Sequence, residues 1–295
     1  MGIFKSGCID KIYSVSAVLG GPRCNASCKH CAGRVLRNDA KKIPEHHCAP
    51  RNIVAASRLA LNYGAWTLSL TSSGEPTLYP DAITDTLRTL RDNGVQWPFI
   101  NLFSNCIELC RDPDRMLKLL YRWKDLGLTS VVLSIHSTDL EENAKVYGNP
   151  TGYLPTPEIL ELIRSTGLCA KVVLLLGKDH IGSLKEYKKS LDTLKEWGVG
   201  QITSWEIRAN DGTRIEQTPS RWEMLKIRLW LMTKTESVMG HVWGGMVRNY
   251  KGMNVRFTDY VTKHRASDDF LRQLVLLPGG TISYSWFQKG RFCLD

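Results

Sequence analysis

The alternation of short apolar runs with longer amphipathic stretches is the feature of this sequence that most constrains its fold. Between residue 12 and about residue 208, runs of four to seven apolar residues recur, separated by stretches with helical periodicity. Repeated strand and helix units of this kind form a parallel sheet covered by helices. With 295 residues and 43% hydrophobic content, the chain can bury the core that such a fold requires.

Six strands are predicted where β-branched and leucine residues dominate the apolar runs. They cover Tyr13–Leu19, Trp66–Leu70, Phe99–Phe103, Ser130–Ile135, Lys171–Leu176 and Ile202–Ile207. Helices are predicted between them, each ending beside a glycine suited to a left-handed cap: Ile53–Tyr63, Asp81–Asn93, Asp112–Leu126, a helix that Pro157 opens, and Ser183–Trp197. The pattern predicts an α/β fold, a partial (β/α)6 TIM-like barrel.

The regular alternation of predicted strands and helices ends after residue 210. A tryptophan-rich helix is predicted from Pro219 to Thr233, and Gly279-Gly280 lies between two β-prone runs, which predicts a hairpin. We therefore expect a barrel over residues 1–210 and, over residues 211–295, a C-terminal extension packed on it that covers the substrate opening. Candidate residues for this cover are Trp243, Arg248, Tyr250, Lys251 and Arg256, and a solvated face with packed aromatic residues is the alternative.

The cysteine content and the net charge indicate the cellular compartment and the kind of binding partner. Three of the nine cysteines fall within eight residues, which favours metal ligation in a reducing compartment over a disulfide framework. No apolar run approaches the ~20 residues of a membrane-spanning helix, and no secretory segment opens the chain, so we expect a cytoplasmic protein without membrane contact. A net charge of +10 predicts attraction to anions such as nucleotides, tRNA or acidic peptides, although a solvated basic surface explains it equally well.

Cys24, Cys28 and Cys31 form a C-x3-C-x2-C motif directly after the first predicted strand. Barrels of this class carry their chemistry in the loops at the carboxyl ends of the strands. A four-iron cluster held by three thiolates keeps one iron open to a small chelating molecule, which makes the cluster catalytic. The alternative is a zinc site, whose fourth ligand could be His30, His46, His47 or Cys48.

This spacing in this place resembles the radical S-adenosylmethionine (SAM) superfamily. The resemblance implies a [4Fe-4S] cluster on Cys24, Cys28 and Cys31, with SAM bound at the open iron and an external one-electron reductant of the flavodoxin or ferredoxin type. The family usually has an aromatic residue before the third cysteine, where this chain has His30.

A second motif follows the second predicted strand. Ser73-Gly74-Glu75 resembles the Gly-Gly-Glu motif of the family, with Ser73 in place of the first glycine. By resemblance, this turn receives the amino group of the methionine moiety of SAM, and an ammonium group does need carbonyl and carboxylate acceptors nearby. Taken alone, the same residues would be read as a surface turn.

Two further strand ends match the family in chain order. Asn105 stands where many members have Thr-Asn-Gly, with Cys106 in place of the glycine, and a plain turn or cap is the alternative. Ser134 and His136 resemble the Ser-x-Asp-Ser region that contacts the ribose and carboxylate of SAM, with His136 in place of the acid. His136 could also exchange protons with a substrate or be a structural histidine.

The resemblance implies that the enzyme reductively cleaves SAM to a 5'-deoxyadenosyl radical, which abstracts a hydrogen atom from the substrate. The sequence from Leu277 to Tyr284 is similar to the hairpin that introduces auxiliary-cluster domains in peptide-maturing relatives, although the expected cysteine is absent. A peptide or protein is therefore the leading substrate. The alternatives are radical modification of a nucleotide, tRNA or small anionic metabolite, and a non-radical zinc protein that binds nucleic acid.

Overall fold

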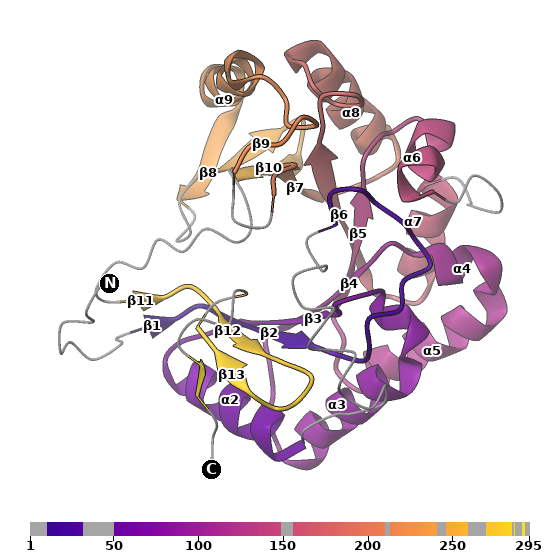
Figure 1. Cartoon of the computed structure of the whole chain (residues 1–295), viewed down its shortest axis with the longest axis vertical. Coiled ribbons are helices and arrows are strands. Elements are labelled where there is room, and N and C mark those ends of the chain that lie inside the picture. Colours follow the sequence, from indigo (N-terminus) through magenta and orange to yellow (C-terminus); the bar gives the residue numbers. More distant parts are fainter. Residues whose placement is uncertain are drawn as a thin grey trace.

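The computed structural model describes residues 11–31, 50–148, 156–209, 213–240, 246–258, 270–284, 286 and 291–292. At its centre lies a twelve-stranded sheet in the order β14-β13-β12-β2-β3-β4-β5-β6-β7-β10-β9-β8. The sheet curves without closing, and the helices that connect its parallel strands lie on the convex side (Figure 1). The chain thus has the α/β architecture of a partial TIM barrel, as the sequence predicts.

The six predicted strands are confirmed within a few residues, and they pair in parallel in chain order. They are β2 (Ser14–Val18), β3 (Thr67–Thr71), β4 (Phe99–Ser104), β5 (Ser130–Ile135), β6 (Cys169–Leu176) and β7 (Gln201–Glu206). The five predicted helices are α2 (Pro50–Asn62), α3 (Pro80–Asp92), α5 (Pro113–Asp125), α7 (Thr156–Ser165) and α8 (Leu184–Glu196). The glycine that follows each of them has a positive φ, as a left-handed cap requires.

Between β3 and β6, three short elements were not predicted: η2 (Pro76–Leu78), α4 (Ile107–Arg111) and α6 (Leu140–Tyr147). They have too few turns to show an apolar stripe, so periodicity alone does not detect them. Helix α6 does carry a start signal, because the Asp139 side chain accepts a hydrogen bond from the backbone N–H of Glu142. All three follow strand ends and border the candidate site.

The C-terminal segments extend the sheet at both edges. Helix α9 (Arg221–Lys234) is the predicted tryptophan-rich helix, and β8 (Glu236–Gly240), β9 (Met246–Tyr250) and β10 (Met253–Thr258) follow it, with β10 parallel to β7. At the other edge β12 (Leu274–Leu276) is parallel to β2 and antiparallel to β13 (Ile282–Ser283), which is the predicted hairpin. The remaining strands are β1 (Lys11–Ile12), β11 (Phe270–Leu271) and β14 (Arg291–Phe292).

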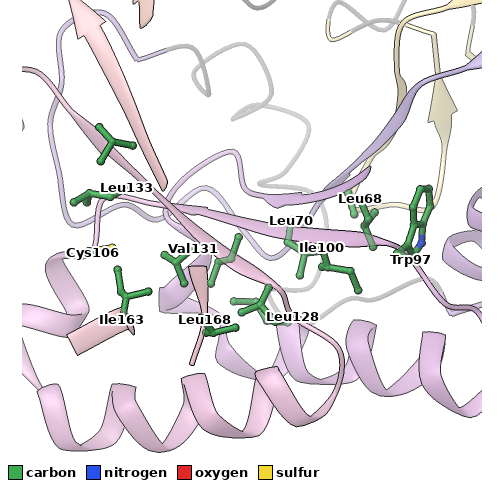
Figure 2. Packing of buried hydrophobic residues seen from close by; sticks show 14 of the residues in the cluster. Leu68, Leu70, Trp97, Ile100, Cys106, Leu128, Val131, Leu133, Ile163 and Leu168 are labelled. Carbon is green, nitrogen blue, oxygen red and sulfur yellow. The ribbon is translucent and has the colours of Figure 1, made fainter. Parts of the chain in front are cut away.

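The two faces of the sheet differ in chemistry. The convex face is apolar: Leu68, Leu70, Ile100 and Val131 are buried between the sheet and the helices (Figure 2). Alternate residues point to the concave face, where the register aligns Ser16, Ser69 and Asn101. The sheet therefore has a helix-covered core on one side and a more polar interior on the other. In the described part of the chain, no helix is both long and apolar enough to cross a membrane.

Candidate functional site

The cysteine loop follows β2 at the carboxyl end of the sheet. Cys24, Cys28 and Cys31 are not in disulfide bonds, and each is partly exposed. The Cys24 Sγ accepts hydrogen bonds from the backbone N–H of Ala26 at 3.4 Å and from Asn105 Nδ2 at 3.9 Å. Donors of this kind stabilise a thiolate and tune an iron–sulfur site. Three partly exposed thiols in one loop, none of them in a disulfide, are a donor set that fits a [4Fe-4S] cluster with one open iron.

A site for a single metal ion needs its ligands grouped around one point, unlike a site for a four-iron cluster. Within the described residues, no three His, Cys, Asp or Glu side chains are grouped closely enough to hold one ion. A four-iron cluster makes another demand, because each thiolate binds its own iron. His46, His47 and Cys48, which the zinc alternative would use, lie outside the described residues.

The loop rests against the end of helix α6. The backbone N–H of Ser27 donates to the carbonyl of Tyr147 at 2.8 Å, and the His30 ring packs edge-on against His136 with centroids 4.7 Å apart. At Gly148, which has φ +67°, a Cβ would lie 2.0 Å from Ser27 Oγ. Only glycine therefore allows the helix end to approach the cysteine loop this closely.

Glu75 is the most heavily hydrogen-bonded carboxylate of the site. Its side chain is buried, and Oε1 accepts from Ser104 Oγ at 2.7 Å and from the Thr77 backbone and hydroxyl at 3.1 and 2.7 Å. Oε2 accepts from the backbone N–H of Asn105 at 3.0 Å. Burial raises the pKa of Glu75, and these four donors oppose the rise.

The residues before Glu75 hold the turn against the cysteine loop. The Glu75 backbone N–H donates to the Arg23 carbonyl at 2.9 Å, and a Cβ on Gly74 would lie 1.9 Å from that same oxygen, so this position requires glycine. Ser73 is fully buried and its hydroxyl donates to the Gly21 carbonyl at 3.2 Å. That bond explains how a serine fits where the family motif has glycine.

Asn105 links this turn to the cysteines. Besides its backbone bond to Glu75, its Nδ2 donates to Asn25 Oδ1 at 2.8 Å, and Asn25 Nδ2 in turn donates to Glu108 Oε1 at 3.0 Å. Cys106, which replaces the family's glycine, adopts a left-handed conformation with φ +58°, where glycine is the least strained residue. The sequence-predicted Glu75, Asn105 and Cys24 therefore lie together, joined by hydrogen bonds.

Ser134 and His136 end strand β5 on the other side of the cysteine loop. The Tyr147 hydroxyl donates to the Ser134 carbonyl, and the His136 backbone N–H donates to Asn143 Oδ1 at 2.8 Å. His136 is buried, and its Nδ1 has no hydrogen-bond partner among the described residues. Burial lowers the pKa of His136 well below its usual range, and His30 and His180 add to the effect.

A neutral His136 has a consequence for acid stability. Because its folded-state pKa lies below the unfolded value of about 6.5, its contribution is fully present above that pH and is lost as the pH falls through the folded value. We expect His136→Gln to flatten the decline of unfolding free energy below pH ~6.5 by up to about 1.4 kcal/mol per pH unit. Denaturant titrations at several pH values measure this, and parallel curves for the two proteins would contradict it.

Other residues at this end of the sheet have structural partners. Glu206, which the sequence places at a strand end, has a side chain only 1% exposed and pairs with Arg208 at 2.7 Å, Arg228 at 3.2 Å and Arg214 at 3.6 Å. These ion pairs join β7 to its following loop and to α9. The residues that sequence reasoning missed are Asn25, Ser27, Ser104 and Tyr147, which position the motif residues and carry no motif of their own.

The candidate cover residues separate into two groups. Arg248 donates to the carbonyl oxygens of Met232 and Thr235, which terminates α9, and Tyr250 and Lys251 both bind Asp192 of α8 at 2.7 and 2.6 Å. These three therefore contact the outer helices. Arg256 lies on β10 and has no such contact, and Trp243 lies outside the described residues. The substrate cover stays a prediction.

Comparison with known proteins gives one family match. The model described as "Radical SAM superfamily" matches residues 18–181, which include the cysteine loop and the strand ends of β3, β4 and β5. A curated relative, the [FeFe] hydrogenase maturase subunit HydE of Thermotoga maritima, is 33% identical over 82 residues. That alignment covers 25% of this chain and 23% of HydE.

Solved structures share the fold over nearly the whole chain. Streptococcus suis SuiB bound to its precursor peptide SuiA superposes with a TM-score of 0.62 at 12% identity, over 97% of this chain and 62% of SuiB. The protein anSMEcpe with bound AdoMet, which is SAM, gives a TM-score of 0.63 at 12% identity, over 95% of this chain and 76% of that one. The chain thus spans about three fifths of the length of SuiB, and at these identities the likeness is one of fold.

Proposed function

Because the chain belongs to the radical SAM superfamily, and is therefore an enzyme with a [4Fe-4S] cluster and SAM as cofactors, we propose that it modifies a peptide by hydrogen abstraction. This family membership favours the iron–sulfur interpretation of the three cysteines over a zinc site. When bound, the cluster and SAM supply a reducing electron and a carbon radical. In this proposal Cys24, Cys28 and Cys31 hold the cluster, and an external reductant of the flavodoxin or ferredoxin type delivers the electron.

The roles proposed for the chain's own residues follow from their contacts. Asn105 connects Glu75 to Cys24, because its backbone N–H donates to the Glu75 carboxylate and its side chain donates to the Cys24 Sγ. A buried carboxylate that is connected to the thiols through a single residue suits the ammonium group of SAM. Ser73 stabilises the turn, and Asn105 connects the turn to the cysteine loop. Ser134 and His136 border the proposed SAM site on the β5 side. This joined arrangement is the observation that carries the proposal.

The peptide assignment rests on two supports. SuiB, whose fold matches 97% of this chain, was solved with its precursor peptide, and anSMEcpe was solved with a peptide as well. The described sheet also does not close on itself, since β10 and β12, at the two ends of its parallel run, are not paired with each other, and an unclosed barrel suits a substrate longer than a small metabolite. A closed barrel would restrict entry to its ends.

Anaerobic activity assays test the proposal. The purified protein is reconstituted with iron and sulfide, reduced with dithionite and given SAM, and 5'-deoxyadenosine is measured by chromatography. We expect slow formation without substrate and faster formation with short peptides encoded next to the gene. A colourless, zinc-containing protein that forms no 5'-deoxyadenosine would contradict the cluster assignment, and stimulation by nucleotides or tRNA alone would contradict the peptide.

A further inference from the structure

The side chain of Arg256 lies on the concave face of the sheet. Arg256 of β10 pairs in parallel register with Thr203 of β7, so both side chains lie on the same face. Trp205, two residues further along β7, shares that face and stacks on Phe103 of β4 with ring centroids 6.5 Å apart. Strands β5 and β6 separate β4 from β7 in the sheet, so these rings can meet only across the concave side. Arg256 therefore faces the interior.

Among the described residues, this guanidinium has no partner of opposite charge. Arg256 is largely buried, its Nε has no hydrogen-bond partner, and it forms no ion pair within the described residues. Burial lowers its pKa to about 10, and Arg272 adds to the lowering. The two acidic residues that are buried in the described part of the chain, Glu75 and Glu206, are engaged by other donors. A buried cation in this state is destabilising until an anion binds it.

Lys171 offers a comparison within the same interior. It also lies on the concave face, because Val173, two residues on, pairs with Thr203. Its Nζ donates to Asn101 Oδ1 at 3.0 Å and lies over the Phe99 ring at 5.6 Å. Lys171 thus has partners from the protein, whereas none is found for Arg256 in the part of the chain that the structure describes.

Arg256 and Arg272 come from the two edges of the parallel run. Arg256 is on β10, next to β7, and Arg272 lies between β11 and β12, near β2, where its carbonyl accepts a hydrogen bond from Ser14. Strands β10 and β12 are not paired with each other among the described residues, and the positive charge of Arg272 is close enough to contribute to the lowered pKa of Arg256. An oxyanion between them would be bound from both edges, and the planar guanidinium matches a carboxylate with two parallel hydrogen bonds.

We propose that Arg256, with Arg272, binds a carboxylate of an acidic peptide substrate at the open side of the sheet, and that this contact selects acidic peptides. The inference rests on the proposed function and adds the substrate's charge to it. The chain's net charge of +10 would favour the encounter with such a peptide. The aromatic pair Trp205 and Phe103 lies on the same face and offers an apolar surface for the flanking residues.

Binding and stability together test Arg256. Calorimetry of the reconstituted protein with SAM measures binding of blocked hexaglutamate and of blocked hexaglutamine. We expect Arg256→Met to weaken hexaglutamate binding by roughly ten- to a hundredfold, and to raise the apparent Tm by a few degrees because an unpaired buried charge is removed. Arg256→Lys keeps the charge and should retain part of the affinity. Arg91→Met is the matched control, since Arg91 is exposed on α3 and pairs only with Asp92.

The outcomes separate a binding role from a structural one. A lower Tm for Arg256→Met with unchanged hexaglutamate affinity would overturn the proposal, as would an equal loss in Arg91→Met. Adenosine monophosphate that binds through Arg256 while hexaglutamate does not would overturn the peptide as the source of the anion. Formation of 5'-deoxyadenosine without peptide should continue at the parent rate in Arg256→Met, whereas failure of the proposed function itself would appear as its absence in the parent protein.

Discussion

Replacing Cys24, Cys28 or Cys31 singly with alanine is expected to abolish 5'-deoxyadenosine formation. A four-iron cluster with one open iron has three protein ligands, so the loss of any one removes a third of its attachment and exposes a second iron. The variants should also lose the brown absorbance of the reconstituted protein. Iron content, the visible spectrum and product formation are measured on the same anaerobic samples.

The matched control is Cys169→Ala. Cys169 is a free, exposed thiol at the start of β6, and its removal changes the cysteine count without touching the loop. We expect parent levels of iron and product in this variant. Full activity in any of the three loop variants would overturn the assignment of the cluster ligands, and loss of activity in Cys169→Ala as well would point to general oxidation damage.

Glu75→Ala is expected to have the largest effect of the non-cysteine substitutions. It leaves two backbone N–H groups and two hydroxyls buried without their acceptor, so the unfolding free energy should fall by about 3 kcal/mol or more. SAM affinity, measured by calorimetry on the reconstituted protein, should fall at least tenfold or so because a charge-assisted partner of the ammonium group is lost.

Two further variants separate stability from cofactor binding. Glu75→Gln keeps the shape and one acceptor oxygen, so it should recover part of the stability while SAM binding stays weak. Glu161→Ala, on the exposed side of α7, removes the same charge and should resemble the parent in both measurements. Unchanged SAM affinity in both Glu75 variants would contradict the proposed cofactor contact.

The sequence predicted the central strands and helices well because their signals are local. Runs of β-branched residues and glycine caps depend on neighbouring residues only. Strand β10 was missed although Met253, Val255 and Phe257 alternate with Asn254, Arg256 and Thr258. Its glycine-rich surroundings concealed an alternation that defines a half-buried strand.

The candidate site was predictable only where a motif exists. The cysteines, Gly74, Glu75 and Asn105 follow family spacing, and the structure adds why Gly74 and the left-handed Cys106 stand where they do. The bonds from Asn25 to Asn105 and from Ser27 to Tyr147 join loops far apart in the sequence. Contacts of this kind depend on how the strands are arranged in the sheet, which no local pattern encodes.

The position of β2 between β3 and β12 bears on how the protein is made. The strand that leads into the cysteine loop gains its second neighbour only when residues 274–276, which lie far from it in the sequence, have been synthesised. Contacts between such distant segments form slowly, because a long loop must close first. The cysteine loop therefore reaches its final support only after these distant residues have been synthesised, and iron delivery to a growing chain before that point would meet a loop whose strand is still half paired.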